Sequence, residues 1–267
     1  MTTPPITSRL FDIAWGALVP VAAVAVYLGL GTVIVRLIKE PIIATSVLGM
    51  LVVILVGAVR IQQPPWLAYA PALRPRRDVR RFGWSVVGCA VLAFLAGQSL
   101  ALWIYSTIGS TGFDVSHQTR RAAGALATLL LTMVAAPAGE EALFRGLIYP
   151  LLRKRVSILA STLVTAIMFG LLHGNAVQFA STLPLAVLLA LTYERTHVLW
   201  PCVLLHLGFN LAAALVPAQA LCALANPISP VFLCLAFAGC AFRLYRRIAN
   251  GPEPGVVQGV GGESAMQ

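Results

Sequence analysis

The chain has 267 residues, of which 59% are hydrophobic and only 10% are charged. Soluble domains contain about 25% charged residues, so this composition excludes an ordinary soluble domain. The formal net charge is +10, but the basic residues cluster in short loops between apolar runs, as in membrane proteins. No basic and aromatic binding module accompanies them, and we therefore expect the lipid bilayer, and no nucleic acid, as a partner.

Apolar runs long enough to cross a bilayer recur along the whole chain. They predict an all-α fold, a polytopic transmembrane helix bundle of about eight spans. The first run is longer than the apolar core of a signal peptide, so we expect it to be retained as a span. The predicted spans are residues 14–35, 41–59, 82–104, part of 128–152, 157–173, 176–193, 199–216 and 228–242.

The segments between and beside these spans carry further expectations. Residues 105–121 are expected to form a polar loop, and residues near 122 an interfacial lead-in to the fourth span. Pro137 and Gly139 are expected to kink that span. The Gly-rich tail from 251 to 267 is expected to be disordered.

The distribution of Lys and Arg predicts the orientation of a multi-pass integral membrane protein. Most of these residues lie in segments on the same side as the N-terminus, so both termini are predicted to be cytoplasmic. The basic run 74–81 reads first as a topology anchor. A contact with anionic lipid or with a substrate tail is the alternative reading.

The stretch Gly139 to Gly146 places three charged side chains between the apolar runs 129–136 and 147–152. A charge at the centre of a membrane helix costs about 2.5–3.5 kcal/mol on insertion scales. Glu141 and Arg145 are four residues apart, so they share a helix face and can form an ion pair. Glu140 lies about 100° further round the helix and has no partner there. An unpaired intramembrane carboxylate predicts a functional site, whereas two purely structural glutamates are the alternative.

Two later spans carry the remaining polar candidates. His173 follows Phe169 at a spacing of four residues, and Asn210 follows His206 at the same spacing. Buried polar side chains must find hydrogen-bond partners, and the cheapest arrangement brings them together at one site. His117 and His197 fall in predicted loops and are expected to be solvated.

Glutamate, histidine and asparagine side chains together support two kinds of hydrolysis. A carboxylate and an imidazole can activate water as a general base, while a histidine and an amide N–H can stabilise an oxyanion. Alternatively, two histidines and a carboxylate can hold a metal such as zinc. The H-E-x-x-H and G-x-S-x-G signatures are absent. The five cysteines lie in or beside apolar segments without a C-x-x-C pair, so neither a disulfide framework nor a cysteine zinc site is predicted.

Three motifs, E-E-x-x-x-R (Glu140, Glu141, Arg145), F-x-x-x-H (Phe169, His173) and H-x-x-x-N (His206, Asn210), occur in this order over residues 137–210. They resemble those of the CPBP family, which includes the type II CAAX prenyl endopeptidases and the bacteriocin-processing and immunity-related proteins. The resemblance divides the bundle into N-terminal spans (1–121), a catalytic core (122–216), and a last span with its tail (217–267). It also implies a bacterial inner-membrane location.

The resemblance implies an intramembrane endopeptidase. Glu140 would be the general base, with His173 assisting it, and His206 and Asn210 would form the oxyanion site. Glu141, Arg145 and Phe169 would support these four. The metal-free mechanism is favoured over zinc, so no cofactor is expected. The substrate would be a membrane-anchored or C-terminally tailed protein or peptide. A non-catalytic immunity or scaffold protein and a proton-coupled transporter are the competing functions.

Overall fold

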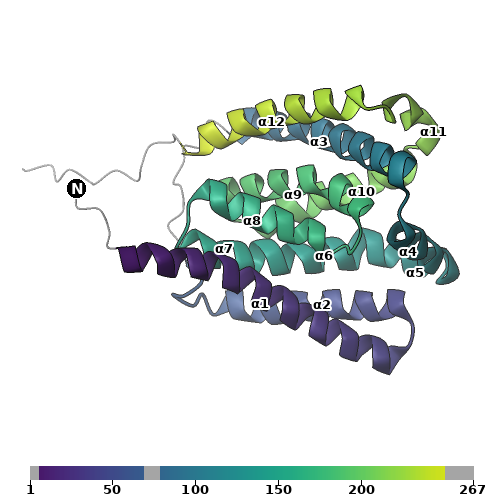
Figure 1. The fold of residues 1–267 in the computed structure, drawn as a ribbon. Helices are drawn as coiled ribbons and strands as arrows, with labels where there is room; N and C mark the ends of the chain where they lie inside the picture. The colour runs from purple at the N-terminus through teal and green to yellow at the C-terminus, as the bar shows by residue number, and fades with distance from the viewer. Residues whose placement is uncertain (1–5, 69–78, 250–267) are drawn as a thin grey trace, which may run out of the picture.

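The computed structural model describes residues 6–68 and 79–249, and every regular element in these two ranges is a helix (Figure 1). The predicted all-α membrane bundle is therefore confirmed. The predicted tail and most of the basic run 74–81 lie outside the described residues. The long helices are α1 (Ile6–Ile38), α2 (Pro41–Ile61), α3 (Val79–Ile108), α9 (Ala176–Thr196) and α12 (Ile228–Ala249).

The helices are arranged in three layers in the view of Figure 1. α1 and α2 pack against each other in one outer layer, and α3 and α12 form the other. Between them lie α8 (Ile158–Leu171), α9, α10 (Leu199–Leu215) and a composite helix over residues 125–153. α9 contacts α3, α8 and α10, which makes it the central helix of the bundle and one of its most buried.

The composite helix is irregular on both sides of the two glutamates. It consists of α5 (Ala125–Leu130), a π-helical segment (Leu131–Ala135), α6 (Ala136–Glu141), a second π-helical segment (Ala142–Ile148) and α7 (Tyr149–Arg153). Pro137 and Gly139, where a kink was expected, both lie in the regular α6, and the two widened turns flank this helix. π-helical turns are rare and occur frequently at functional sites.

Each of the eight predicted spans coincides with a helix, but the spans 157–173 and 199–216 extend by one or two residues beyond α8 and α10. Six helices in the described ranges are long and apolar enough to cross a membrane, namely α1, α2, α3, the composite helix, α9 and α12. α8 has 14 residues and α10 has 17. α8 carries Phe169 of the second motif, whose His173 lies in the turn that follows, and α10 carries the third motif.

The expectation of a polar loop over residues 105–121 is wrong. α3 continues to Ile108, and α4 (Thr111–Ala122) follows, ending at a turn in which Gly124 has a φ of 85°. The backbone N–H of Phe113 donates to the side chain of Ser110, which caps the first turn. Asp114 near the start and Arg120 and Arg121 at the end match the helix dipole. α4 buries no residue, so its polar composition reflects a surface helix.

α2 and the composite helix approach closely where two glycines meet. A Cβ atom on Gly139 would lie 2.6 Å from the Cα atom of Gly49, and one on Gly49 would lie 2.6 Å from the carbonyl oxygen of Ala135. Small residues at such crossings let two backbones pack directly. Glu140 is the next residue, so this contact fixes the depth and rotation of the proposed catalytic glutamate.

We predict that Gly49→Ala lowers the free energy of unfolding by about 1–3 kcal/mol, because the added methyl group forces the two helices apart. Gly57→Ala, in the same helix, is the matched control, since its Cβ would meet nothing within 4 Å. That control should be neutral or stabilising, because alanine favours a helix over glycine. Denaturation midpoints in detergent micelles measure both, and equal effects of the two substitutions would contradict the prediction.

Candidate active site

The two charges predicted to pair do so in the centre of the bundle. A guanidinium nitrogen of Arg145 donates to Oε1 of Glu141 at 3.2 Å, and both side chains are fully buried. The other terminal nitrogen of Arg145 donates to the backbone carbonyl of Ala186, in α9, at 2.7 Å. The pair therefore neutralises two buried charges and also joins the composite helix to α9.

His206 lies between the two glutamates. Its Nδ1 is 3.0 Å from Oε1 of Glu141, and its Nε2 is 4.0 Å from Oε2 of Glu140. Because carboxylate oxygens accept hydrogen bonds, we assign a hydrogen to Nδ1. The contact with Glu141 then orients the ring and leaves Nε2 directed at Glu140 from the buried middle of α10.

Glu140 differs from its neighbour in both exposure and partners. Its side chain is 15% exposed, whereas that of Glu141 is completely buried. Oε2 of Glu140 makes no hydrogen bond with any described residue. Buried polar atoms are normally satisfied, so an unsatisfied carboxylate oxygen facing an imidazole calls for an explanation. It is suited to accept a proton from a molecule that enters the site.

Phe169, on α8, is the apolar centre of the cluster. Its buried ring contacts the rings of His206 and His173, with centroids 5.6 Å and 5.4 Å away. It also packs edge-to-face on Phe144 at 5.3 Å. The guanidinium carbon of Arg145 lies 5.1 Å from the Phe169 centroid, within cation–π range. One aromatic ring thus links all three motifs.

His173 is placed at the edge of the cluster, in the turn after α8. Its Nδ1 is 3.0 Å from the carbonyl oxygen of Phe169, so we assign that nitrogen as the donor and Nε2 as an acceptor. Within residues 6–68 and 79–249, no hydrogen bond or ion pair joins His173 to Glu140. The structure therefore brings His173 to the site through Phe169 and not through the glutamate.

Asn210 shares a face of α10 with His206, but its amide nitrogen donates to the carbonyl oxygen of Thr132 at 2.7 Å. Thr132 belongs to the first π-helical segment. In the second segment, Arg60 of α2 donates to the carbonyl oxygen of Gly146 at 3.1 Å and to the hydroxyl of Tyr193 at 2.8 Å. A side chain from another helix thus binds each π-helical segment.

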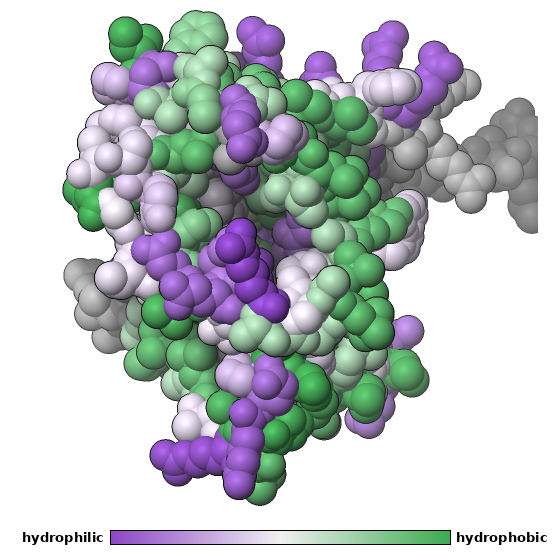
Figure 2. All heavy atoms as spheres, turned by 90° about the vertical axis from the view of Figure 1, so that its right-hand side faces the viewer, coloured by the Kyte–Doolittle hydropathy of each residue, from purple (hydrophilic) through white to green (hydrophobic). Residues whose placement is uncertain are grey.

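The sequence analysis missed Arg60 and Arg120 as neighbours of the site. Arg60 stands at the end of an apolar span, where basic residues commonly set the membrane topology. The sequence therefore did not distinguish that role from the hydrogen bonds that Arg60 makes to Gly146 and Tyr193. Arg120, on α4, is half-buried and close enough to Glu140 for their charges to interact. Burial lowers the pKa of Arg120, and the Glu140 charge opposes this shift. Figure 2 views this end of the bundle, where hydrophilic residues gather beside a hollow in the surface.

In the part of the chain that the structure describes, no three His, Cys, Asp or Glu side chains are grouped so that they could hold a metal ion. We therefore derive no step through a metal.

We predict that Arg145→Met destabilises the protein by about 3–5 kcal/mol, because it leaves a buried carboxylate without its charge partner. The double variant Glu141→Gln/Arg145→Met should lose clearly less, since it removes both charges together. Arg121→Met, on the exposed surface of α4, is the control and should change little. Unfolding in mixed micelles titrated with SDS measures these differences, and a double variant as unstable as Arg145→Met would contradict the role of the pair.

Comparison with known proteins bears on the same segment. Residues 122–212 match the family described as type II CAAX prenyl endopeptidase Rce1-like. The chain is also 23% identical over 146 residues to a Bacillus subtilis (strain 168) protein named "Putative membrane peptidase YdiL". The aligned part makes up 51% of this chain and 60% of the relative. The match thus spans less than two thirds of that relative's length.

No solved structure matches the chain. The matched family segment contains all seven residues of the three motifs, the whole of α8 and most of α10. The resemblance predicted from the motifs is thereby confirmed for residues 122–212, which are similar to the Rce1-like family of type II CAAX prenyl endopeptidases.

Proposed function

We propose that the protein is an intramembrane endopeptidase that hydrolyses a peptide bond with a water molecule activated by Glu140. The observation that carries this proposal is that Oε2 of Glu140 makes no hydrogen bond with a described residue and faces Nε2 of His206 at 4.0 Å, whereas Glu141 contacts both Arg145 and His206 through Oε1. The Rce1-like match over residues 122–212 supports a proteolytic role.

In the proposed reaction, Glu140 takes a proton from water while the water oxygen forms a bond to the scissile carbonyl carbon. His206 with a proton on Nε2, together with the second amide hydrogen of Asn210, donates to the resulting oxyanion. Before the reaction, the carboxylates of Glu140 and Glu141 together balance the charges of Arg145 and of the protonated ring. The intermediate collapses with cleavage of the C–N bond, and Glu140 returns its proton to the leaving amine. His173 assists at the edge of the site.

The position of the site limits its substrates. Glu140 lies in the middle of the composite helix, about 20 Å from either end at 1.5 Å per residue. A peptide bond reaches that depth if its chain is anchored in the bilayer or enters as a flexible tail. We therefore propose a membrane-anchored or C-terminally tailed protein or peptide as the substrate, with the enzyme in a bacterial inner membrane and both termini in the cytoplasm.

A scaffold or immunity function is the second candidate, and one observation favours it. Asn210 donates to the Thr132 carbonyl, which is a structural role that needs no catalysis. On this hypothesis the buried cluster would hold the four core helices together and bind no substrate.

The decisive experiment compares membrane proteomes from cells that express wild-type protein or Glu140→Gln at equal levels. We predict that C-terminal or juxtamembrane fragments present with the wild type disappear with Glu140→Gln. Glu40→Gln, outside the site between α1 and α2, is the matched control and should leave every fragment in place. If folded Glu140→Gln gives the same peptides and supports the same cellular phenotype, the scaffold function is adopted instead.

Asn210→Ala separates catalysis from scaffolding at the same residue. Loss of an oxyanion donor lowers kcat by roughly 10²–10³-fold with little change in KM. Loss of the hydrogen bond to Thr132 alone would lower the free energy of unfolding by about 1 kcal/mol. It would leave kcat of the folded protein unchanged. Kinetics on a fragment-releasing substrate, corrected for the folded fraction, should therefore show the large kcat effect. A rate that follows the folded fraction would contradict an oxyanion role for Asn210.

A further inference from the structure

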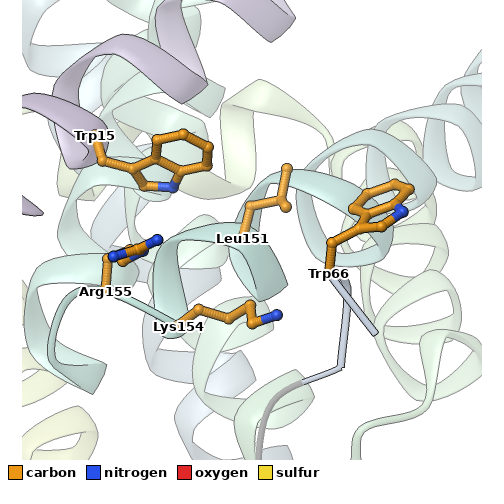
Figure 3. A pocket seen from close by; sticks show the side chains of 5 residues that line it. All are labelled: Trp15, Trp66, Leu151, Lys154 and Arg155. Carbon is orange, nitrogen blue, oxygen red and sulfur yellow. The ribbon is translucent and has the colours of Figure 1, made fainter. Parts of the chain in front are cut away.

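A cavity of about 360 Å³ lies at the end of the bundle that the charge distribution predicts to be cytoplasmic (Figure 3). It is far from α4, which lies at the other end of the composite helix (Figure 1). Its walls come from α1, from the turn that follows α2, and from the end of α7 and the residues just after it. The residues that line it are Trp15, Trp66, Leu151, Lys154 and Arg155.

The residues that line the cavity change from apolar to basic towards the end of the bundle. Trp15 and Leu151 belong to the apolar spans Ala14–Ile38 and Ala125–Arg153, close to their ends. Lys154 and Arg155 follow the second of these spans directly. Tryptophan and basic residues in this relation are typical of the level where hydrocarbon meets headgroups. The cavity therefore crosses that boundary, with an apolar part within the span and cations beyond it.

Both cations are held in place by their neighbours. The ammonium of Lys154 donates to the carbonyl oxygen of Pro65 at 2.7 Å and has two further hydrogens to donate. The guanidinium carbon of Arg155 lies 5.7 Å from the ring of Trp15 and 5.1 Å from that of Phe11. Such fixed donors lose little conformational entropy when a ligand binds.

The neighbouring basic residue has a different role. Arg153 makes two hydrogen bonds to the carboxylate of Glu194, each of 3.1 Å, which ties α7 to α9. Lys154 and Arg155 are exposed, and the described residues that line the cavity include no acidic one. An anion outside the bundle can therefore reach both side chains.

We propose that this cavity binds one anionic phospholipid. Its phosphate would lie between Lys154 and Arg155, and an acyl chain would run along Trp15, Leu151 and Trp66. The cavity is of the size of small-ligand sites, roughly 300–1,000 Å³. A zwitterionic lipid is disfavoured, because its quaternary ammonium would face the two cations. The site is independent of the proteolytic reaction, so this proposal stands whether or not the protein is a protease.

Trp15 and Trp66 serve as reporters of the bound lipid. A background with Trp84→Phe, Trp103→Phe and Trp200→Phe leaves these two as the tryptophans of the chain. The full-length protein is placed in vesicles of phosphatidylcholine with one fifth phosphatidylglycerol, and either lipid carries bromine on its acyl chains to quench fluorescence. We expect quenching per brominated lipid to be several-fold stronger when phosphatidylglycerol carries the bromine.

The variant Lys154→Gln/Arg155→Gln should abolish this several-fold preference, because each basic residue near the surface contributes about fivefold. The charge-conserving variant Lys154→Arg/Arg155→Lys should keep most of it. Arg246→Gln/Arg247→Gln removes the same charge from exposed positions near the end of α12, at the same end of the bundle, and should leave it unchanged.

Two results would overturn the proposal. Equal quenching by the two lipids in the starting protein would show that the cavity does not select an anionic lipid. An equal loss with Arg246→Gln/Arg247→Gln would show attraction of the whole basic end to the leaflet and not a defined site. Fragment release by the same variants, measured in parallel, tests the proteolytic function separately.

Discussion

The buried ion pair between Glu141 and Arg145 is the constraint on which the rest of the core depends. Two charges in an apolar bundle are tolerable only while each keeps its partners. Arg145 finds its second partner on α9, and Glu141 finds His206 on α10. The ring of Phe169, from α8, covers the same cluster. The composite helix, α8, α9 and α10 therefore meet around this ion pair. Glu140 lies beside them, and its Oε2 makes no hydrogen bond with a described residue.

The irregular composite helix and its neighbours support each other. A π-helical turn disturbs the regular hydrogen-bond pattern, and in a membrane the affected backbone groups must be satisfied inside the protein. Asn210 and Arg60 each donate to a carbonyl oxygen in one of the two widened segments. Hydrogen bonds from other helices thus hold the composite helix on both sides of the two glutamates. This contact gives Asn210 a structural role in addition to its proposed part in catalysis.

Local pattern predicted most of the fold and the composition of the candidate site. Apolar length located eight apolar helical segments, six of which are long enough to cross a membrane, and the spacing of four residues predicted the pair of Glu141 and Arg145. Contacts between helices were beyond local pattern, so the bond from Asn210 to Thr132 and the role of Arg60 had no signal in the sequence. α4 was missed because a polar surface helix and a polar loop have the same composition. Its capping residue, Ser110, was the one available sign.

The short lengths of α8 and α10 have a consequence for the bilayer itself. With 14 and 17 residues they rise about 21 Å and 26 Å, less than a hydrocarbon core of about 30 Å. Such a hydrophobic mismatch is relieved by local thinning of the bilayer or by polar groups that reach into it. If the proposed substrate enters beside α8 and α10, local thinning would shorten the layer of hydrocarbon that its polar backbone has to cross to reach Glu140.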